Sequence, residues 1–324
     1  MLIIVAALVS LLLTLVLSIP YLDYLKNNFY GQYIREEAPE RHNQKAGTPT
    51  MGGIMIVIPS IIGAVLALVM NQKATIPSLI VLVVYGAFML LGFQDDISKI
   101  TKKQNKGLSA RAKFALQILI SLLPVLYVTF SGETSLSLFG FKSVNLAYFY
   151  PILATFIITG SSNAVNLTDG LDGLAGGTSA IVFATLSLLC FLTGRIDLAI
   201  VSAAIAGSCI GFLYYNKYPA KVFMGDTGSL ALGGALGAIA VVGKLELWVA
   251  LTGLIFVIEA MSVIMQVTSF KTTGKRIFKM SPIHHHFELC GWKEQKVVYS
   301  FCGFTLISCI TAILLMLHVL KLPG

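Results

Sequence analysis

Long stretches without a single Asp, Glu, Lys or Arg dominate this sequence, and most are close to the length of a membrane span. A helix needs about 20 apolar residues to cross the hydrocarbon core of a bilayer. Nine such stretches run along the chain, and a tenth is interrupted only by Glu259. They are 2–20, 52–72, 74–94, 114–132, 143–168, 173–194, 198–216, 228–243, 247–268 and 297–320. The sequence therefore predicts an all-α integral membrane protein with ten transmembrane helices, in one polytopic domain that covers 1–324.

The composition excludes a soluble enzyme of ordinary type. Only 12% of the 324 residues are charged and 56% are hydrophobic, whereas about 25% of a soluble domain is charged. Outside the predicted helices, 131–147 has alternating polar and apolar residues, which predicts a small hairpin. The sequence shows no other candidate domain.

Lys and Arg are divided unevenly between alternate connections of the predicted bundle. Five connections hold 18 of the 23 Lys and Arg residues, at about 21–51, 95–113, 166–174, 215–228 and 269–296. The side of a membrane protein that carries more Lys and Arg faces the cytoplasm. We therefore expect these five connections to be cytoplasmic and both termini to be extracytoplasmic. This topology and anionic headgroups account for most of the net charge of +8. No nucleic-acid-binding motif occurs, so we expect no nucleic-acid partner.

The unusual polar motifs all fall in these five connections. They are KAGTPTMGG (45–53), FQDDISKITKK (93–103), NAVNLTDGLDGLAGG (163–177), NKYPAKVFMGDTGS (216–229) and SPIHHHFELCGW (281–292). Because the five connections share one face of the membrane, the sequence predicts a single polar active site on the cytoplasmic face.

Three aspartates in these motifs are candidates for catalysis. Asp95 and Asp96 are adjacent, and neighbouring helical residues diverge by about 100°. We therefore expect different roles, one aspartate reaching a nucleophile while the other holds a cation or a lysine. Asp226 lies between Gly225 and Gly228. It is either the N-cap of a helix or a ligand of magnesium, an ion that takes one or two carboxylates and substrate phosphates.

The other motifs suggest ligand recognition. Asp169 and Asp172 in DGLDG either form a turn or bind a polar group such as a ribose hydroxyl or a base edge. Phe223 either stacks on a base or anchors its loop in the membrane. The histidines at 284–286 suit a phosphate-rich pocket better than a metal site, because consecutive side chains do not easily share one ion.

The apolar segment 247–268 contains one charged residue, Glu259, and one amide, Gln266. Glu259 is costly inside a membrane span, so we expect it to face the bundle or to mark a break in the helix. Gln266 follows seven residues later on the same helical face. This face is expected to support the site.

Carboxylates, lysines, histidines and amides beside a membrane favour phosphoryl transfer, which depends on positioning and charge neutralisation. In this order GTPTMGG, the Asp pair, NLTDGLDGL, FMGDTGS and PIHHHFE resemble the polyprenyl-phosphate N-acetylhexosamine-1-phosphate transferases. The unbroken histidine triplet is similar to that of the bacterial phospho-N-acetylmuramoyl-pentapeptide transferases. That resemblance implies magnesium-dependent transfer of phospho-MurNAc-pentapeptide from its UDP derivative to undecaprenyl phosphate, which yields lipid I and UMP in peptidoglycan synthesis. It also implies a homodimer in the bacterial cell membrane.

The resemblance assigns roles to matching positions. Asp226 would bind magnesium, and Asp95 and Asp96 would serve the lipid phosphate, with Asp95 as the base. The uridine pocket would comprise Asn166, Asp169, Asp172, Phe223 and Gln266. The sugar and phosphates would be held by Lys45, Thr50, Asn216, His284, His285 and His286.

Three alternatives remain open. In the first, a carboxylate attacks the substrate and forms a covalent phospho-sugar enzyme, in place of direct attack by the lipid phosphate. In the second, the substrate is UDP-GlcNAc, as in relatives that interrupt the histidine triplet. In the third, the protein is a transporter; such proteins place polar groups near mid-membrane, whereas here Glu259 is the one acidic residue inside a predicted span.

Overall fold

The computed structural model describes residues 1–28, 47–101 and 107–321, and Lys45 lies outside this part of the chain. The described residues form a helical bundle with one small hairpin, as predicted. In chain order the elements are α1 (Leu2–Asn28), α2 (Ile54–Met70), α3 (Ile76–Thr101), α4 (Ala110–Phe130), β1 (Ser135–Leu138), β2 (Lys142–Asn145), η2 (Ala147–Phe149), α5 (Tyr150–Thr168), α6 (Leu174–Leu192), α7 (Ile196–Asn216), α8 (Gly225–Gly243), α9 (Glu246–Thr252), α10 (Leu254–Thr273), α11 (Ile283–Leu289) and α12 (Glu294–Val319).

Eight of the described helices are long and apolar enough to cross a membrane: α1, α3, α4, α6, α7, α8, α10 and α12. The apolar helix α2 is shorter, with 17 residues. Several helices continue into ranges that the sequence analysis assigned to connections. For example, α3 extends to Thr101 and therefore contains Asp95 and Asp96.

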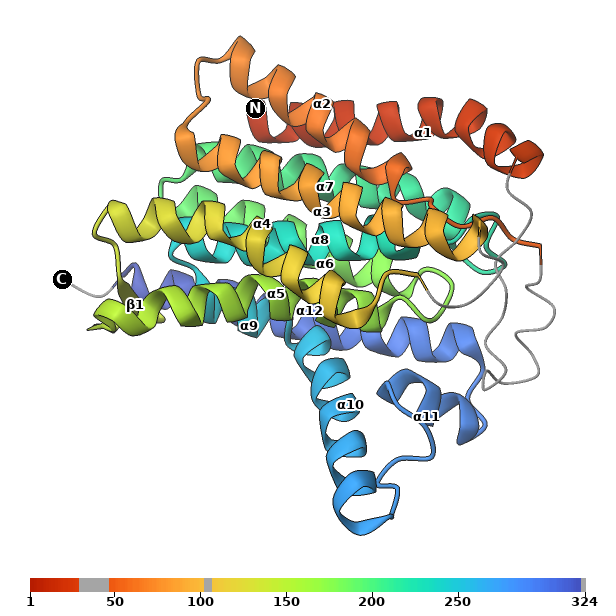
Figure 1. Ribbon diagram of the computed structural model, residues 1–324. Coiled ribbons are helices and arrows are strands. Elements are labelled where there is room, and N and C mark those ends of the chain that lie inside the picture. Colours follow the sequence, from red (N-terminus) through yellow and green to blue (C-terminus); the bar gives the residue numbers. More distant parts are fainter. Residues whose placement is uncertain (29–46, 102–106, 322–324) are drawn as a thin grey trace.

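The long helices lie side by side around α7 and α8 (Figure 1). In the most apolar window of α8, 89% of the residues are buried, compared with 28% for α4 and α10. Close packing of α8 depends on glycine. A Cβ on Gly233 would lie 2.3 Å from the backbone oxygen of Ser161, and one on Gly237 would lie 2.6 Å from Cα of Ile158. Small residues thus allow α8 to approach α5 closely.

The apolar segment 247–268 is broken, but at Gly253 and not at Glu259. The chain forms α9, breaks at Gly253 and continues as α10, which leaves the bundle at a steep angle (Figure 1). The cause is tertiary. The carbonyl of Leu251 accepts a hydrogen bond from the hydroxyl of Ser308, and that of Thr252 accepts one from the thiol of Cys309. Both donors belong to α12, so its contacts hold the end of α9 in place at the break.

Candidate active site

Three aspartates meet between α3 and α8, and we call them the aspartate cluster. One carboxylate oxygen from each of Asp95, Asp96 and Asp226 lies within 4.8 Å of the other two. Gly92, one turn before Asp96, makes this approach possible, because a Cβ there would lie 2.0 Å from the carbonyl oxygen of Asp226. The two predicted motifs therefore form one site.

Asp96 caps the N-terminus of α8. Its Oδ1 accepts a hydrogen bond from the N–H of Asp226 (3.2 Å), and its Oδ2 accepts from the N–H (2.9 Å) and the hydroxyl (2.6 Å) of Thr227. A carboxylate is favoured here because the first N–H groups of a helix lack partners within it and carry partial positive charge. The alternative that Asp226 caps this helix is wrong, since its carboxylate bonds to Lys113 and Asn166.

Two lysines offset part of the charge of the aspartate cluster. Lys99 Nζ lies 2.7 Å from Asp95 and 3.1 Å from Asp226. Lys113 Nζ, from α4, lies 2.5 Å from Asp226 and 3.2 Å from Asp95. The adjacent aspartates thus differ in their main partners. Asp95 contacts both lysines, whereas Asp96 bonds to the start of α8 and lies farther from Lys99, at 3.9 Å. The sequence analysis singled out neither lysine. The position of Lys99 one helical turn after the pair was the available signal.

Asn166 fixes the remaining oxygen of Asp226. Its Nδ2 donates to Asp226 Oδ1 (2.9 Å) and to the hydroxyl of Ser229 (2.8 Å). Side chains of α3, α4 and α5 therefore all hold the same carboxylate at the start of α8.

Two glycine-containing motifs pair through their backbones. The N–H of Phe223 donates to the carbonyl of Pro49 (2.8 Å), and the N–H of Gly52 donates to the carbonyl of Phe223 (2.8 Å). This pairing places Thr50 beside Gly225, where a Cβ would lie 2.7 Å from the Thr50 hydroxyl oxygen. That hydroxyl is buried and has no hydrogen-bond partner among the described residues. An unpaired hydroxyl next to the aspartate cluster is suited to a ligand.

Asp172 and Asn216 connect loops of the site. Asp172 Oδ2 accepts from the N–H of Ala220 (2.9 Å). The amide of Asn216 accepts from the N–H of Gly173 (3.0 Å) and donates to the carbonyl of Val222 (2.9 Å). Both side chains therefore hold the turn after α5 against the loop before α8, and this loop carries Phe223.

Asp169 ends α5 on the same side of the site. Burial, together with the charges of Asp226 and Asp96, raises the pKa of its carboxyl to about 8. Near neutral pH this residue therefore carries a proton and can donate a hydrogen bond.

The first histidine of the triplet is held by Glu259. Glu259 Oε1 lies 3.0 Å from His284 Nδ1, and its Oε2 accepts from the N–H of Ile283 (2.9 Å). Both side chains are fully buried. His284 Nε2 packs against Gly170, where a Cβ would lie only 2.3 Å away. Glu259 thus faces the protein, as expected, and links α10 and α11 to the turn that contains Asp169.

The other two histidines of the triplet and Gln266 have different partners. His285 Nδ1 lies 2.8 Å from Glu288, and His286 Nδ1 accepts from the N–H of Lys279 (3.2 Å). Gln266 accepts from the N–H groups of Ile277 and Phe278 at 3.0 and 2.9 Å. The Gln266 amide therefore shapes the connection between α10 and α11.

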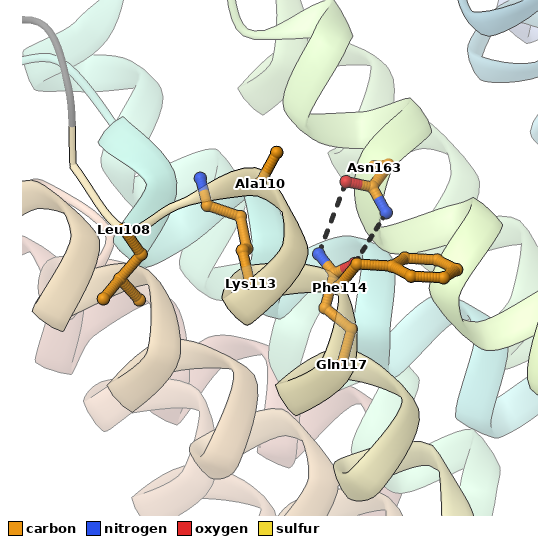
Figure 2. Close-up of a pocket in the computed structure, with 6 residues that line it drawn as sticks. All are labelled: Leu108, Ala110, Lys113, Phe114, Gln117 and Asn163. Atoms are coloured by element: carbon orange, nitrogen blue, oxygen red, sulfur yellow. Dashed lines mark hydrogen bonds between the residues drawn. The ribbon is translucent and has the colours of Figure 1, made fainter.

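A pocket of about 360 Å³ opens between α4 and α5. Figure 2 shows the residues that line it, which are Leu108, Ala110, Lys113, Phe114, Gln117 and Asn163. Phe114 is 53% exposed, so the pocket borders the apolar outer surface of the bundle. Lys113 lines this pocket and also contacts Asp226. The pocket therefore leads from the lipid-facing surface towards the aspartate cluster.

Comparisons with known proteins agree with this arrangement. Residues 78–244 match the family described as Glycosyl transferase family 4, and residues 45–57 match Phospho-N-acetylmuramoyl-pentapeptide-transferase signature 1. The Phospho-N-acetylmuramoyl-pentapeptide-transferase of Geobacillus sp. (strain WCH70) is 46% identical over 300 residues, which cover 92% of this chain and 93% of the relative. Proteins of the same name from Desulforamulus reducens and Bacillus subtilis (strain 168) are each 49% identical, over 91% of this chain and 90% of their own. The chain belongs to the phospho-N-acetylmuramoyl-pentapeptide-transferase family.

Membership of this transferase family confirms the resemblance seen in the five motifs. The family segment 78–244 begins in α3 and ends directly after α8, so it contains the whole aspartate cluster. The signature at 45–57 contains Thr50 and Gly52, which lie in the segment that pairs with the loop before α8. Segments shared with the family are thus the ones that meet at the site.

Proposed function

We propose that this protein transfers phospho-MurNAc-pentapeptide from UDP-MurNAc-pentapeptide to undecaprenyl phosphate, giving lipid I and UMP. The observation that carries the proposal is the aspartate cluster with its two lysines, placed beside a pocket at the apolar surface of the bundle. Such a site can take an anionic substrate from water and another from the membrane. The names of the family relatives support the same reaction.

The protein is proposed to cross the bacterial cell membrane ten times, with α2 and α5 as spans besides the eight long apolar helices. The site then faces the cytoplasm and both termini face outward. Support comes from the sequence, in which the five connections that carry the polar motifs hold 18 of the 23 Lys and Arg residues. A homodimer is proposed on the resemblance alone.

Magnesium is the proposed cofactor, and the donor set fits it. Hard divalent cations prefer oxygen ligands, and three carboxylates lie within reach of one another. Both oxygens of Asp96 accept hydrogen bonds from the first turn of α8, two of them from backbone N–H groups. Asp226 is held by side chains alone, the lysines and Asn166, which can exchange partners. Asp226 is therefore the proposed ligand, with Asp95 beside it. The ion would supply charge neutralisation around the phosphates.

The lysines and Asp95 are proposed to act on the lipid phosphate. Lys113 lies between the pocket and Asp226, so its ammonium group can bind a phosphate whose isoprenoid chain extends into the pocket. Lys99 and Lys113 reduce the repulsion between two anionic substrates. Asp95 accepts any proton that the lipid phosphate still carries. An oxygen of the lipid phosphate then bonds to the β-phosphorus, and the bond to the UMP oxygen breaks.

The nucleotide substrate is proposed to occupy the other side of the aspartate cluster. The unpaired hydroxyl of Thr50 would donate to a phosphate oxygen. The resemblance assigns Lys45 and the histidines to the sugar and phosphates as well. Asp169 and Phe223 would contact the uridine, while Asp172, Asn216 and Gln266 hold the loops that form its pocket. Direct attack is favoured over a covalent intermediate, because the lipid phosphate is already largely ionised near neutral pH.

The test is UMP release by purified protein supplied with undecaprenyl phosphate, magnesium and UDP-MurNAc-pentapeptide. Asp226→Ala and Asp95→Asn are expected to abolish it. Asp197→Asn is the matched control, because Asp197 is a buried aspartate in the first turn of α7, away from the site. It contacts Arg195 (3.7 Å) and accepts a hydrogen bond from the hydroxyl of Thr75. Turnover of UDP-GlcNAc alone would show that the substrate is wrong. Uptake of a solute into proteoliposomes without UMP release would favour the transporter.

A further inference from the structure

The N-terminal part of α4 has almost no apolar packing. Among residues 110–117, only Gln117 is buried. Its amide forms a reciprocal pair with Asn163 of α5 (Figure 2). Asn163 Nδ2 donates to Gln117 Oε1 (2.8 Å), and Gln117 Nε2 donates to Asn163 Oδ1 (3.4 Å). Because few apolar contacts fix this end of α4, polar contacts hold it: the ion pairs of Lys113 with the aspartate cluster and the amide pair with α5.

The amide pair lies directly next to the residues that hold Asp226. Gln117 is four residues after Lys113 on α4, and Asn163 is three residues before Asn166 on α5. Both spacings place the pair one helical turn away on the same faces. Lys113 and Asn166 each contact the carboxylate of Asp226. Helices α4 and α5 are therefore connected in two successive helical turns. In one turn Lys113 and Asn166 both bond to Asp226, and in the next Gln117 and Asn163 bond to each other.

We infer that Gln117 and Asn163 are positioning residues, which keep Lys113 aligned with Asp226 and set the width of the pocket for the lipid phosphate. This inference rests on the proposed function. A cation and a lipid phosphate compete with the ion pair between Lys113 and Asp226, so this pair must loosen during turnover. The amide pair does not take part in that exchange. It holds α4 in register while Lys113 changes partners.

The chemistry of the pair suits this role. Amide hydrogen bonds are directional, and they are strengthened in surroundings of low dielectric constant. Apolar contacts between helices would permit sliding. Both amides also line the pocket, so a displacement of either one changes the space beside Lys113. Neither amide contacts the aspartate cluster directly in the described structure, which separates this role from catalysis.

Gln117→Leu tests the inference, because it keeps a side chain of similar length and removes the pair. With substrate absent, we expect Lys113 to react several-fold faster with an amine-specific succinimidyl ester, as measured by mass spectrometry. In steady-state assays we expect the KM for undecaprenyl phosphate to rise about tenfold, which corresponds to about 1.4 kcal/mol. The KM for the UDP substrate is expected to change less than about twofold, because the amides line only the pocket beside Lys113. The exchanged pair Gln117→Asn/Asn163→Gln is expected to restore both values.

Ser121→Ala is the matched control. Ser121 is buried one turn further along α4, and within the described part of the chain its hydroxyl bonds only to the carbonyl of Ile118 in its own helix. A merely structural amide pair would lower the thermal midpoint of Gln117→Leu and leave the KM values and the labelling of Lys113 at wild-type levels, which would overturn the inference. If wild-type protein releases no UMP but Lys113 labelling still rises in Gln117→Leu and falls in the exchanged pair, the positioning role stands and the proposed function fails.

Discussion

Replacing Asp96 by Asn tests whether this residue serves the architecture of the site. Asp96 accepts three hydrogen bonds from the first turn of α8. An asparagine retains one oxygen but presents an NH₂ group to a backbone N–H, so at least one hydrogen bond is lost and the negative charge disappears. Hydrogen bonds to charged groups contribute about 1.5–3 kcal/mol, and a partly buried charge at a helix end contributes up to about 2 kcal/mol. Loss of the charge also relieves the repulsion between Asp96 and the nearby carboxylate of Asp226, so we expect a net loss of about 1–3 kcal/mol in the free energy of unfolding.

The assay compares the thermal midpoint and UMP release of Asp96→Asn with those of Thr227→Val. The valine removes only the hydroxyl that donates to Asp96, and this costs about 1 kcal/mol. Because the two residues share a hydrogen bond, the double variant should lose less than the sum of the single losses. Activity should fall together with stability, since Asp226 shares the displaced first turn of α8. An unchanged thermal midpoint with lost activity would refute the capping role and make Asp96 a catalytic group.

Three further predictions concern the surroundings of the aspartate cluster. Gly92→Ala should lower both the thermal midpoint and the activity, because its Cβ would lie 2.0 Å from a backbone oxygen of α8, whereas Gly86→Ala on the same helix has 3.9 Å to its nearest neighbour and should change neither. Glu259→Gln should raise the KM for the UDP substrate more than that for the lipid, since it weakens the support of the Asp169 turn; equal changes in the two KM values would contradict this. Without substrate or divalent ions, stability should fall as the pH rises from the ordinary carboxyl range to about 8, because the raised pKa of Asp169 makes the folded state bind the extra proton. In a pH series of thermal midpoints, Asp169→Asn should show a smaller decrease in stability over this pH range. A profile identical to that of the wild type would show that another group is responsible.

The membrane made much of the fold predictable. Backbone polar groups in a bilayer must be satisfied within the segment, so long apolar stretches predict helices without knowledge of tertiary contacts. The described structure confirms the helical bundle and the hairpin of β1 and β2. The uneven division of Lys and Arg then allowed five separate motifs to be assigned to one site. The predicted proximity of Asp95, Asp96 and Asp226 follows from that division and is confirmed.

Contacts between distant segments were not predictable in the same way. The break at Gly253 depends on hydrogen bonds from Ser308 and Cys309 of α12, and no local pattern indicates them. Lys113 and its aspartate partner are 113 residues apart. A lysine near a helix start is common at a membrane surface, so its role became visible only when α4 was placed beside α8.

The distribution of packing explains why a site of this kind uses two types of helix. Asp226 belongs to α8, whose most apolar segment is 89% buried, and the capping residue Asp96 belongs to α3, where the figure is 50%. Lys113 and Glu259 belong to α4 and α10, where it is 28%. A deeply packed helix holds the aspartate cluster at fixed positions, as charge neutralisation during phosphoryl transfer requires. A substrate that enters from the bilayer must pass a helix that can move. The sparse apolar packing of α4 makes this helix suitable, and it lies beside the pocket. Polar attachments such as the Gln117–Asn163 pair restore alignment there without closing the border with apolar side chains. Tighter apolar packing of α4 would therefore be expected to raise the thermal midpoint and to slow entry of the lipid.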